Sequence, residues 1–318
     1  MSDSHTSCSL SNHYVMTRIA PLIPKLQSRS ASLTTLELSS SSSALLRVLR
    51  PAALIKPTHG TSEPASHTED IPVVATVSIG DVGIDGVSGR VEQLRARWGS
   101  SSLLGVLVVS GDKAGKWGPD SDAPVEGIRA AHRSLRKFHY EDTSSKVPSR
   151  QVWAVTNPMV GADKLEKELE KALRKVDAGA NCLVTQPPLL WSRFESWLNL
   201  CERRGLFKTN VPILIGMTPI YDADSFTRWL KLCGVGDQTP MDFWDAEIGD
   251  ELDRWRSHHD NEKDRVASIE HFKVRHEFIR DHLNGIVSGI HVMPMKKKGH
   301  DILKDAIEKG EIGISSTY

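Results

Sequence analysis

Short apolar runs alternate along the chain with longer stretches in which apolar residues recur at helical spacing. A short apolar run bounded by turn residues predicts a strand, whereas the helical spacing predicts a helix. Strands are expected at 32–38, 52–55, 71–79, 103–109, 151–155, 182–184, 213–215 and 289–293. Helices are expected at 44–49, 90–97, 125–138, from 163 up to a turn at 178–180, and at 193–204, 224–232, 245–281 and 300–309. The glycine-rich stretch 80–89 predicts a loop before the second of these helices.

This order of elements predicts a wound α/β protein. Helices lie between most consecutive strands, and the number of predicted strands is that of a (β/α)8 TIM barrel. The chain has 318 residues, enough for one such barrel with a single core, and it shows neither an internal repeat nor a second domain. We therefore expect a single-domain TIM barrel over residues 32–318.

Residues 1–31 form a serine-rich segment ahead of the predicted barrel. It carries the basic residues Arg18, Lys25 and Arg29 but only one acid, Asp3. A disordered leader is one interpretation of this composition. A mitochondrial transit peptide is the other, because such peptides are rich in arginine and serine and poor in acids.

Composition excludes several classes of protein. Hydrophobic residues make up 39% and charged residues 25% of the chain, which is typical of a soluble globular protein. The net charge of zero gives no electrostatic case for nucleic acid, and no apolar run approaches a membrane span. None of the four cysteines forms a Cys-x-x-Cys pair, so we expect no metal and no disulfide framework. A reducing, cytoplasmic location follows as the simplest expectation, with mitochondria as the alternative.

Two glycine motifs fail as nucleotide sites. The stretch Gly111–Lys116 is one residue short of a P-loop and is followed by Trp117 instead of serine or threonine. The glycines at 80, 83 and 86 have the wrong spacing for a dinucleotide fingerprint.

The segment 173–186 is the most informative part of the chain. A charged helix ends at the small Ala178-Gly179-Ala180 turn, and a short apolar strand follows and stops at Thr185-Gln186. In a (β/α)8 barrel the chemistry lies at the carboxyl ends of the strands. Gln186 would lie there and offer an amide that both donates and accepts hydrogen bonds.

This segment resembles the methylenetetrahydrofolate reductases, which commonly carry Lys-x-Asp-Ala-Gly-Ala-Asp/Asn, apolar residues and then Thr-Gln. Residues 211–220 look like the family's Pro-Ile-Ile-Pro-Gly-Ile-x-Pro-Ile strand, and together the two matches span 163–234. Family members are FAD-dependent (β/α)8 barrels. The resemblance therefore implies FAD as cofactor and NAD(P)H as co-substrate. It also implies reduction of 5,10-methylenetetrahydrofolate to 5-methyltetrahydrofolate in one-carbon metabolism, with folate as the small-molecule partner and self-association left open.

The resemblance also assigns roles to residues. Glu37 would be the general acid towards folate, and Asp112 would tune the electrostatics near flavin and pterin. Positions that match the family's flavin-binding residues are Thr58, His59, Ser110, Glu168, Lys171, Arg174, Lys175 and Ala180. Positions that match its substrate-binding residues are Gln186, Trp229 and Lys297. The helical spacing of Glu168, Lys171 and Lys175 places these three on one face, where the two cations would suit a diphosphate.

Each of these residues also has a plain structural interpretation. Asp112 can cap a loop, Glu37 can face water from an edge strand, Gln186 can cap a strand end, and Trp229 can belong to the core. The charges between 168 and 175 can form a solvated helix face.

The chain also departs from the family. Ser110 stands where the family has arginine, and Val74-Ala75-Thr76 lacks the usual histidine. Residues 155–158 lack the family's tyrosine and histidine, and at the eighth strand only His291 keeps its place. A barrel that binds folate or flavin, or serves as a partner protein, without catalysis is therefore the alternative function.

Overall fold

The computed structural model describes residues 73–111, 121–141, 151–235, 246–256, 261–283, 286–293 and 296–312. Within these ranges the strands form one sheet in which every neighbouring pair is parallel. They follow one another across the sheet in chain order. The strands are β1 (Val73–Ser78), β2 (Leu103–Val109), β3 (Gln151–Thr156), β4 (Cys182–Thr185), β5 (Ile213–Met217) and β6 (Gly289–Val292).

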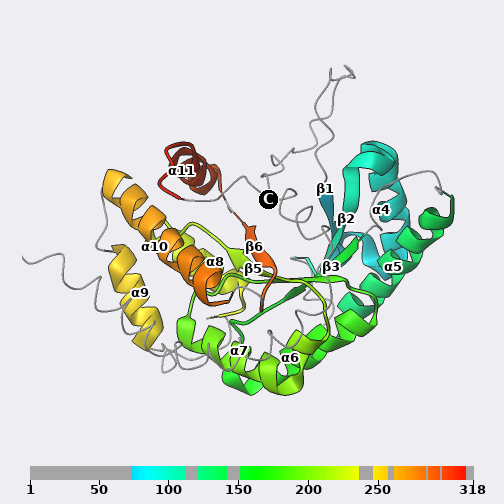
Figure 1. Ribbon diagram of the computed structural model, residues 1–318, viewed down its shortest axis with the longest axis horizontal. Coiled ribbons are helices and arrows are strands. Elements are labelled where there is room, and N and C mark those ends of the chain that lie inside the picture. The colour runs from blue at the N-terminus through cyan, green and yellow to red at the C-terminus, as the bar shows by residue number, and fades with distance from the viewer. Residues whose placement is uncertain are drawn as a thin grey trace, which may run out of the picture.

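Helices lie in an arc around the curved sheet (Figure 1). They are α4 (Ile79–Ser102), α5 (Ala123–Glu141), α6 (Ala162–Asp177), α7 (Trp191–Arg204), α8 (Ala223–Leu232), α9 (Ala246–Arg256), α10 (Asn261–His282) and α11 (Lys297–Glu308). Parallel strands in chain order with helices between them are the arrangement of a (β/α)8 barrel, so the predicted α/β class and the six predicted strands from 71–79 onwards are confirmed. The predicted strands 32–38 and 52–55, the helix 44–49 and the leader 1–31 lie outside the described residues.

One predicted element was wrong. Residues 80–89 are not a loop, because α4 begins at Ile79. Buried Ile79, Val87 and Val91 lie on the side of this helix that joins the core, and burying them outweighs the cost of about 1 kcal/mol for each helical glycine. The stretch 245–281 is helical in its described residues, as predicted, and contains α9 and α10.

The two faces of the sheet bury different sets of side chains. The large core cluster joins one face to the helices. The other, which we call the inner face, carries a separate buried cluster of Leu104, Trp153, Cys182, Val184 and Leu214. Strand register places Trp153 beside Cys182, and Val184 beside Leu214. A packed inner layer of this kind is what fills the interior of a (β/α)8 barrel.

None of the helices in the described ranges combines the length and the apolar composition that a membrane crossing requires.

Candidate functional site

The carboxyl ends of the parallel strands meet at one edge of the sheet, where (β/α)8 barrels place their chemistry (Figure 1). Backbone hydrogen bonds join neighbouring ends there. They run from Gly80 N to Ser110 O (2.8 Å), from Gln186 N to Thr156 O (2.8 Å) and from Met293 N to Met217 O (2.7 Å). These bonds fix the strand ends to each other in pairs, and we call the edge that they form the rim.

Gln186 lies on this rim directly after β4. Its backbone is fixed by the bond to Thr156, and the side chain is half-buried. Its amide has no hydrogen-bond partner among the described residues, whereas the residues that follow it, Pro187–Leu190, are all buried. A half-buried amide on a rigid segment is a group that a bound molecule can satisfy.

Gly216 of β5 brings the neighbouring backbone close to Gln186. A Cβ atom at this position would lie 2.2 Å from the carbonyl oxygen of Thr185 and 3.1 Å from the carbonyl carbon of Gln186. The amide of Gly216 donates to Thr185 Oγ1 at 2.9 Å. The absence of a side chain therefore lets β4 and β5 approach closely at the rim.

Glu168 of α6 fixes the loop that follows β3. Its Oε1 accepts a bond from the amide of Asn157 at 2.9 Å and one from Thr156 Oγ1 at 3.3 Å. The Asn157 side chain in turn donates to the carbonyl of Cys233 at 2.8 Å and accepts from the amide of Met159 at 2.9 Å. The carboxylate predicted to belong to a flavin site thus holds protein backbone in this structure.

Lys175, on the same helix, is buried and points at β3. Its Nζ donates to the carbonyl of Val155 at 2.6 Å. Burial lowers the pKa of this ammonium, and the Glu168 carboxylate opposes that shift. Ala180 is buried in the core, and Lys171 is half-buried one turn before Lys175. Glu168 and Lys175 therefore converge on the carboxyl end of β3.

Arg174 points elsewhere. Its Nη2 forms an ion pair of 2.6 Å with Asp122 Oδ2, just before α5, and both side chains are partly exposed. The hydrogen bond from Arg174 holds the pKa of the Asp122 carboxyl below its usual value. Arg174 therefore links two helices on the surface and does not join Glu168 and Lys175.

These contacts decide whether the charged side chains of α6 can bind the diphosphate of a flavin cofactor. Glu168, Arg174 and Lys175 each bind another part of the protein, and Lys171 is half-buried. A diphosphate needs cations aimed into an accessible cradle. The described part of the predicted flavin set does not form such a cradle.

A close backbone approach also occurs between β1 and β2. Gly111 has a φ of +81°, and a Cβ there would lie 2.1 Å from Ser78 Oγ. That hydroxyl is buried and has no hydrogen-bond partner among the described residues. Ser110 is exposed beside it. The predicted residues Glu37, Thr58, His59 and Asp112 lie outside the described residues.

His291 of β6 is paired in register with Gly216 and belongs to the inner face. Its Nδ1 is buried and has no hydrogen-bond partner within the described ranges, and burial lowers the pKa of the imidazole to about 4. The side chain is therefore neutral near pH 7.

The depressed pKa predicts a pH dependence of stability. The unfolded chain takes up a proton on His291 near pH 6.5, but the folded chain does so only near pH 4, so stability is lost as the pH falls through this window. Replacing His291 with glutamine should reduce the loss between pH 7 and pH 5 by about 2 kcal/mol. Urea unfolding of both proteins at several pH values measures this difference in stability. If the free energy of unfolding fell equally with pH in both proteins, the prediction would be contradicted. His300→Gln, which changes a partly exposed histidine, is the control.

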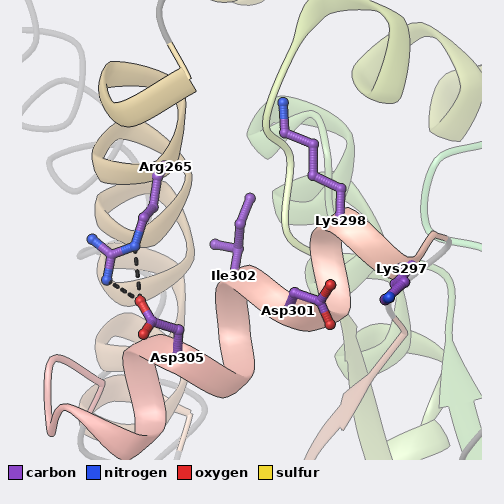
Figure 2. Close-up of a pocket in the computed structure, with 6 residues that line it drawn as sticks. All are labelled: Arg265, Lys297, Lys298, Asp301, Ile302 and Asp305. Atoms are coloured by element: carbon purple, nitrogen blue, oxygen red, sulfur yellow. Dashed lines mark hydrogen bonds and ion pairs between the residues drawn. The ribbon is translucent and has the colours of Figure 1, made fainter.

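The structure also describes the two remaining predicted substrate residues, Trp229 and Lys297. Trp229 of α8 is only 6% exposed and belongs to the core. Lys297 is exposed at the start of α11, beside an open depression of about 480 Å³. Figure 2 shows Lys297 at the opposite end of this depression from the Arg265–Asp305 ion pair, and Gln186 is not among its lining residues.

Two residues at the rim were missed by the sequence analysis. Asn157 joins the loop after β3 to the end of α8, and Glu247 of α9 binds the start of α7. Their partners are far away in the chain, so no local spacing pattern identifies them. The place of Asn157, a polar residue just after a predicted strand, could have indicated a role at the strand end. No feature of the sequence indicated the role of Glu247.

The family model described as "Methylenetetrahydrofolate reductase" matches residues 138–305. Methylenetetrahydrofolate reductase 1 of Schizosaccharomyces pombe is 33% identical over 86 residues, which are 27% of this chain and 13% of that protein. The chain therefore matches a small part of this curated relative's length.

A solved structure also aligns, described as an uncharacterized protein from Clostridium thermocellum that binds two copies of 5-methyl-5,6,7,8-tetrahydrofolic acid. The alignment covers 75% of this chain and 95% of that protein, with 12% identity and a TM-score of 0.34. This likeness is too distant to carry an argument about either fold or ligand.

Proposed function

The chain belongs to the methylenetetrahydrofolate reductase family, whose model covers more than half of it, and from this premise we propose that it binds a reduced folate at the rim beside Gln186. The observation that carries the proposal is the side-chain amide of Gln186. It lies at the carboxyl end of β4, half-buried and without a partner among the described residues. An amide can donate to and accept from the pterin ring at once.

The surroundings of Gln186 support the same proposal. Gly216 keeps the neighbouring strand free of a side chain, and His291 lies beside Gly216 in register as a neutral imidazole. Neutral hydrogen-bonding groups on a rigid rim suit a neutral heterocycle such as a pterin. Both strands that flank this position lie within the part of the chain that the family model matches.

The finer form of the proposal is the family reaction, reduction of 5,10-methylenetetrahydrofolate with NAD(P)H. When bound, FAD supplies the hydride-transfer chemistry. In this proposal Gln186 orients the pterin, Glu37 is the acid that helps to open the folate ring, and Asp112 tunes the local electrostatics.

The second candidate is a folate-binding barrel without catalysis. It is favoured by the contacts of α6, where Glu168 and Lys175 bind the end of β3 and Arg174 binds Asp122. Charges engaged in this way are not available to a diphosphate.

The visible absorbance of the purified full-length protein separates the two candidates. The reductase proposal expects flavin absorbance with close to one FAD per chain, and oxidation of NAD(P)H that depends on the folate substrate. A colourless protein that does not take up added FAD would contradict the reductase proposal, while folate binding by that protein would support the second candidate.

Replacing Gln186 with alanine should weaken binding of 5-methyltetrahydrofolate about tenfold, because two hydrogen bonds to the pterin are lost. Thermal stability should hardly change, since the amide has no partner in the protein among the described residues. Titration calorimetry measures the affinity. Gln93→Ala, an exposed position on α4, is the matched control. An unchanged dissociation constant would place the folate site elsewhere.

A further inference from the structure

Helix α7 begins without a cap from its own segment. Its N-cap residue, Leu190, provides no side-chain hydrogen bond to the helix. The first amides of any helix need an acceptor from outside the helix. In α7 this acceptor comes from α9: Glu247 Oε1 accepts from the amide of Trp191 at 2.5 Å and from that of Ser192 at 3.4 Å.

The second carboxylate oxygen of Glu247 is engaged as well. Oε2 accepts from the Ser192 hydroxyl and, at 3.4 Å, from the Ser192 amide. A carboxylate at a helix N-terminus is also favoured by the helix dipole. One side chain of α9 therefore accepts hydrogen bonds from the first two backbone amides of α7.

Helix α10 holds the same turn of α7 through the side chain of Trp191. The guanidinium carbon of Arg275 lies 5.4 Å from the centroid of the Trp191 ring, and Phe278 meets that ring edge to face at 5.2 Å. Glu247 lies close enough to Arg275 to favour its charged form. The start of α7 is thus held through its backbone by α9 and through its first side chain by α10.

On the other side, the loop after β3 holds the segment. Leu190 N donates to Met159 Sδ at 3.4 Å, and Arg193 Nη1 donates to the carbonyl of Met159 at 2.6 Å. Between these anchors and Gln186 lie only buried residues. The position of Gln186 is therefore coupled to the position of the first turn of α7.

We propose that Glu247 is a positioning residue for Gln186, and this inference rests on the proposed folate site. By fixing the start of α7, Glu247 fixes the short buried segment whose first residue presents its amide to the pterin. A binding group that is held in place before the ligand arrives avoids the cost of ordering it during binding. Loss of the carboxylate would leave the amide present but displaced.

The test compares Glu247→Ala and Glu247→Gln in the full-length chain, with Asp250→Ala, an exposed acid of the same helix, as the control. Titration with 5-methyltetrahydrofolate is carried out at a temperature at which circular dichroism shows every variant folded. We expect Glu247→Ala to weaken folate binding at least fivefold. Glu247→Gln, which keeps one acceptor oxygen, should recover part of the loss, and the control should match the wild type.

Hydrogen exchange at the Trp191 and Ser192 amides is measured on the same samples and should be faster in Glu247→Ala. Faster exchange with unchanged folate affinity would overturn the positioning role while leaving the folate proposal in place. A wild-type protein that binds no folate would overturn both. If Glu247→Ala does not fold, Glu247→Gln alone decides, since unchanged affinity with faster exchange at these amides contradicts the inference.

Discussion

Replacing Glu251 with alanine is expected to lower the free energy of unfolding by about 3–5 kcal/mol, the usual cost of leaving a buried charge without its partner. Glu251 of α9 is 8% exposed. It accepts bonds from Arg254 Nη1 at 3.0 and 3.2 Å, and Arg275 Nη2 lies 3.7 Å away. Burial lowers the pKa of Arg275 to about 10, and Glu251 is the first group that opposes this shift. Without Glu251, that buried guanidinium would lose the carboxylate that does most to favour its charged form.

Urea unfolding of the variant and the wild type measures this loss. Asp253→Ala is the control, because the Asp253–Arg256 pair on the same helix is mostly exposed and such pairs contribute little. The double variant Glu251→Leu/Arg275→Met should be more stable than Glu251→Ala alone, since it removes both charges. A loss below about 1 kcal/mol in Glu251→Ala would show that Arg275 is solvated or paired in another way.

Replacing Gly216 with alanine should lower the free energy of unfolding by about 3 kcal/mol and abolish folate binding. The added Cβ would lie 2.2 Å from the carbonyl oxygen of Thr185 and 2.4 Å from Met293 Cε. The methionine tip can move, but the carbonyl belongs to the backbone of β4. Strand β5 would therefore have to move away from β4 beside Gln186.

Gly249→Ala on α9 is the matched control for this substitution. Nothing lies within 4 Å of a Cβ at that position. Alanine there should stabilise the chain by about 0.5–1 kcal/mol, because it favours the helix. If Gly216→Ala were equally harmless, the inference that β4 and β5 approach closely at the rim would be contradicted.

The strands were predictable because each is a short apolar run between turn residues, a signal that is local in the chain. Strand β2 has the predicted limits, and β3 and β4 differ from prediction by one residue at the end. Helix α4 was predicted too short, since glycine content hid the apolar positions that pack on the sheet. In α4, the burial of apolar side chains against the sheet outweighs the low helix propensity of glycine.

Part of the site was predictable as well, because the end of a strand is also marked by a local pattern in the sequence. The end of β4 places Gln186 at the rim, as the segment 173–186 indicated. The spacing of Glu168, Lys171 and Lys175 predicted a shared helix face, but spacing does not show whether a charge meets solvent, ligand or protein. Lys175 turns to Val155, and Glu247 caps a helix far earlier in the chain. Contacts of this kind depend on the packed fold and have no local pattern.

The measurement that tests the central claim most directly is a calorimetric titration of the full-length protein with 5-methyltetrahydrofolate, in parallel for the wild type and Gln186→Ala. The folate proposal predicts saturable binding to the wild type and binding about tenfold weaker in the variant. Absence of saturable binding to a folded wild-type protein, or equal affinity in both proteins, would contradict a folate site at the end of β4.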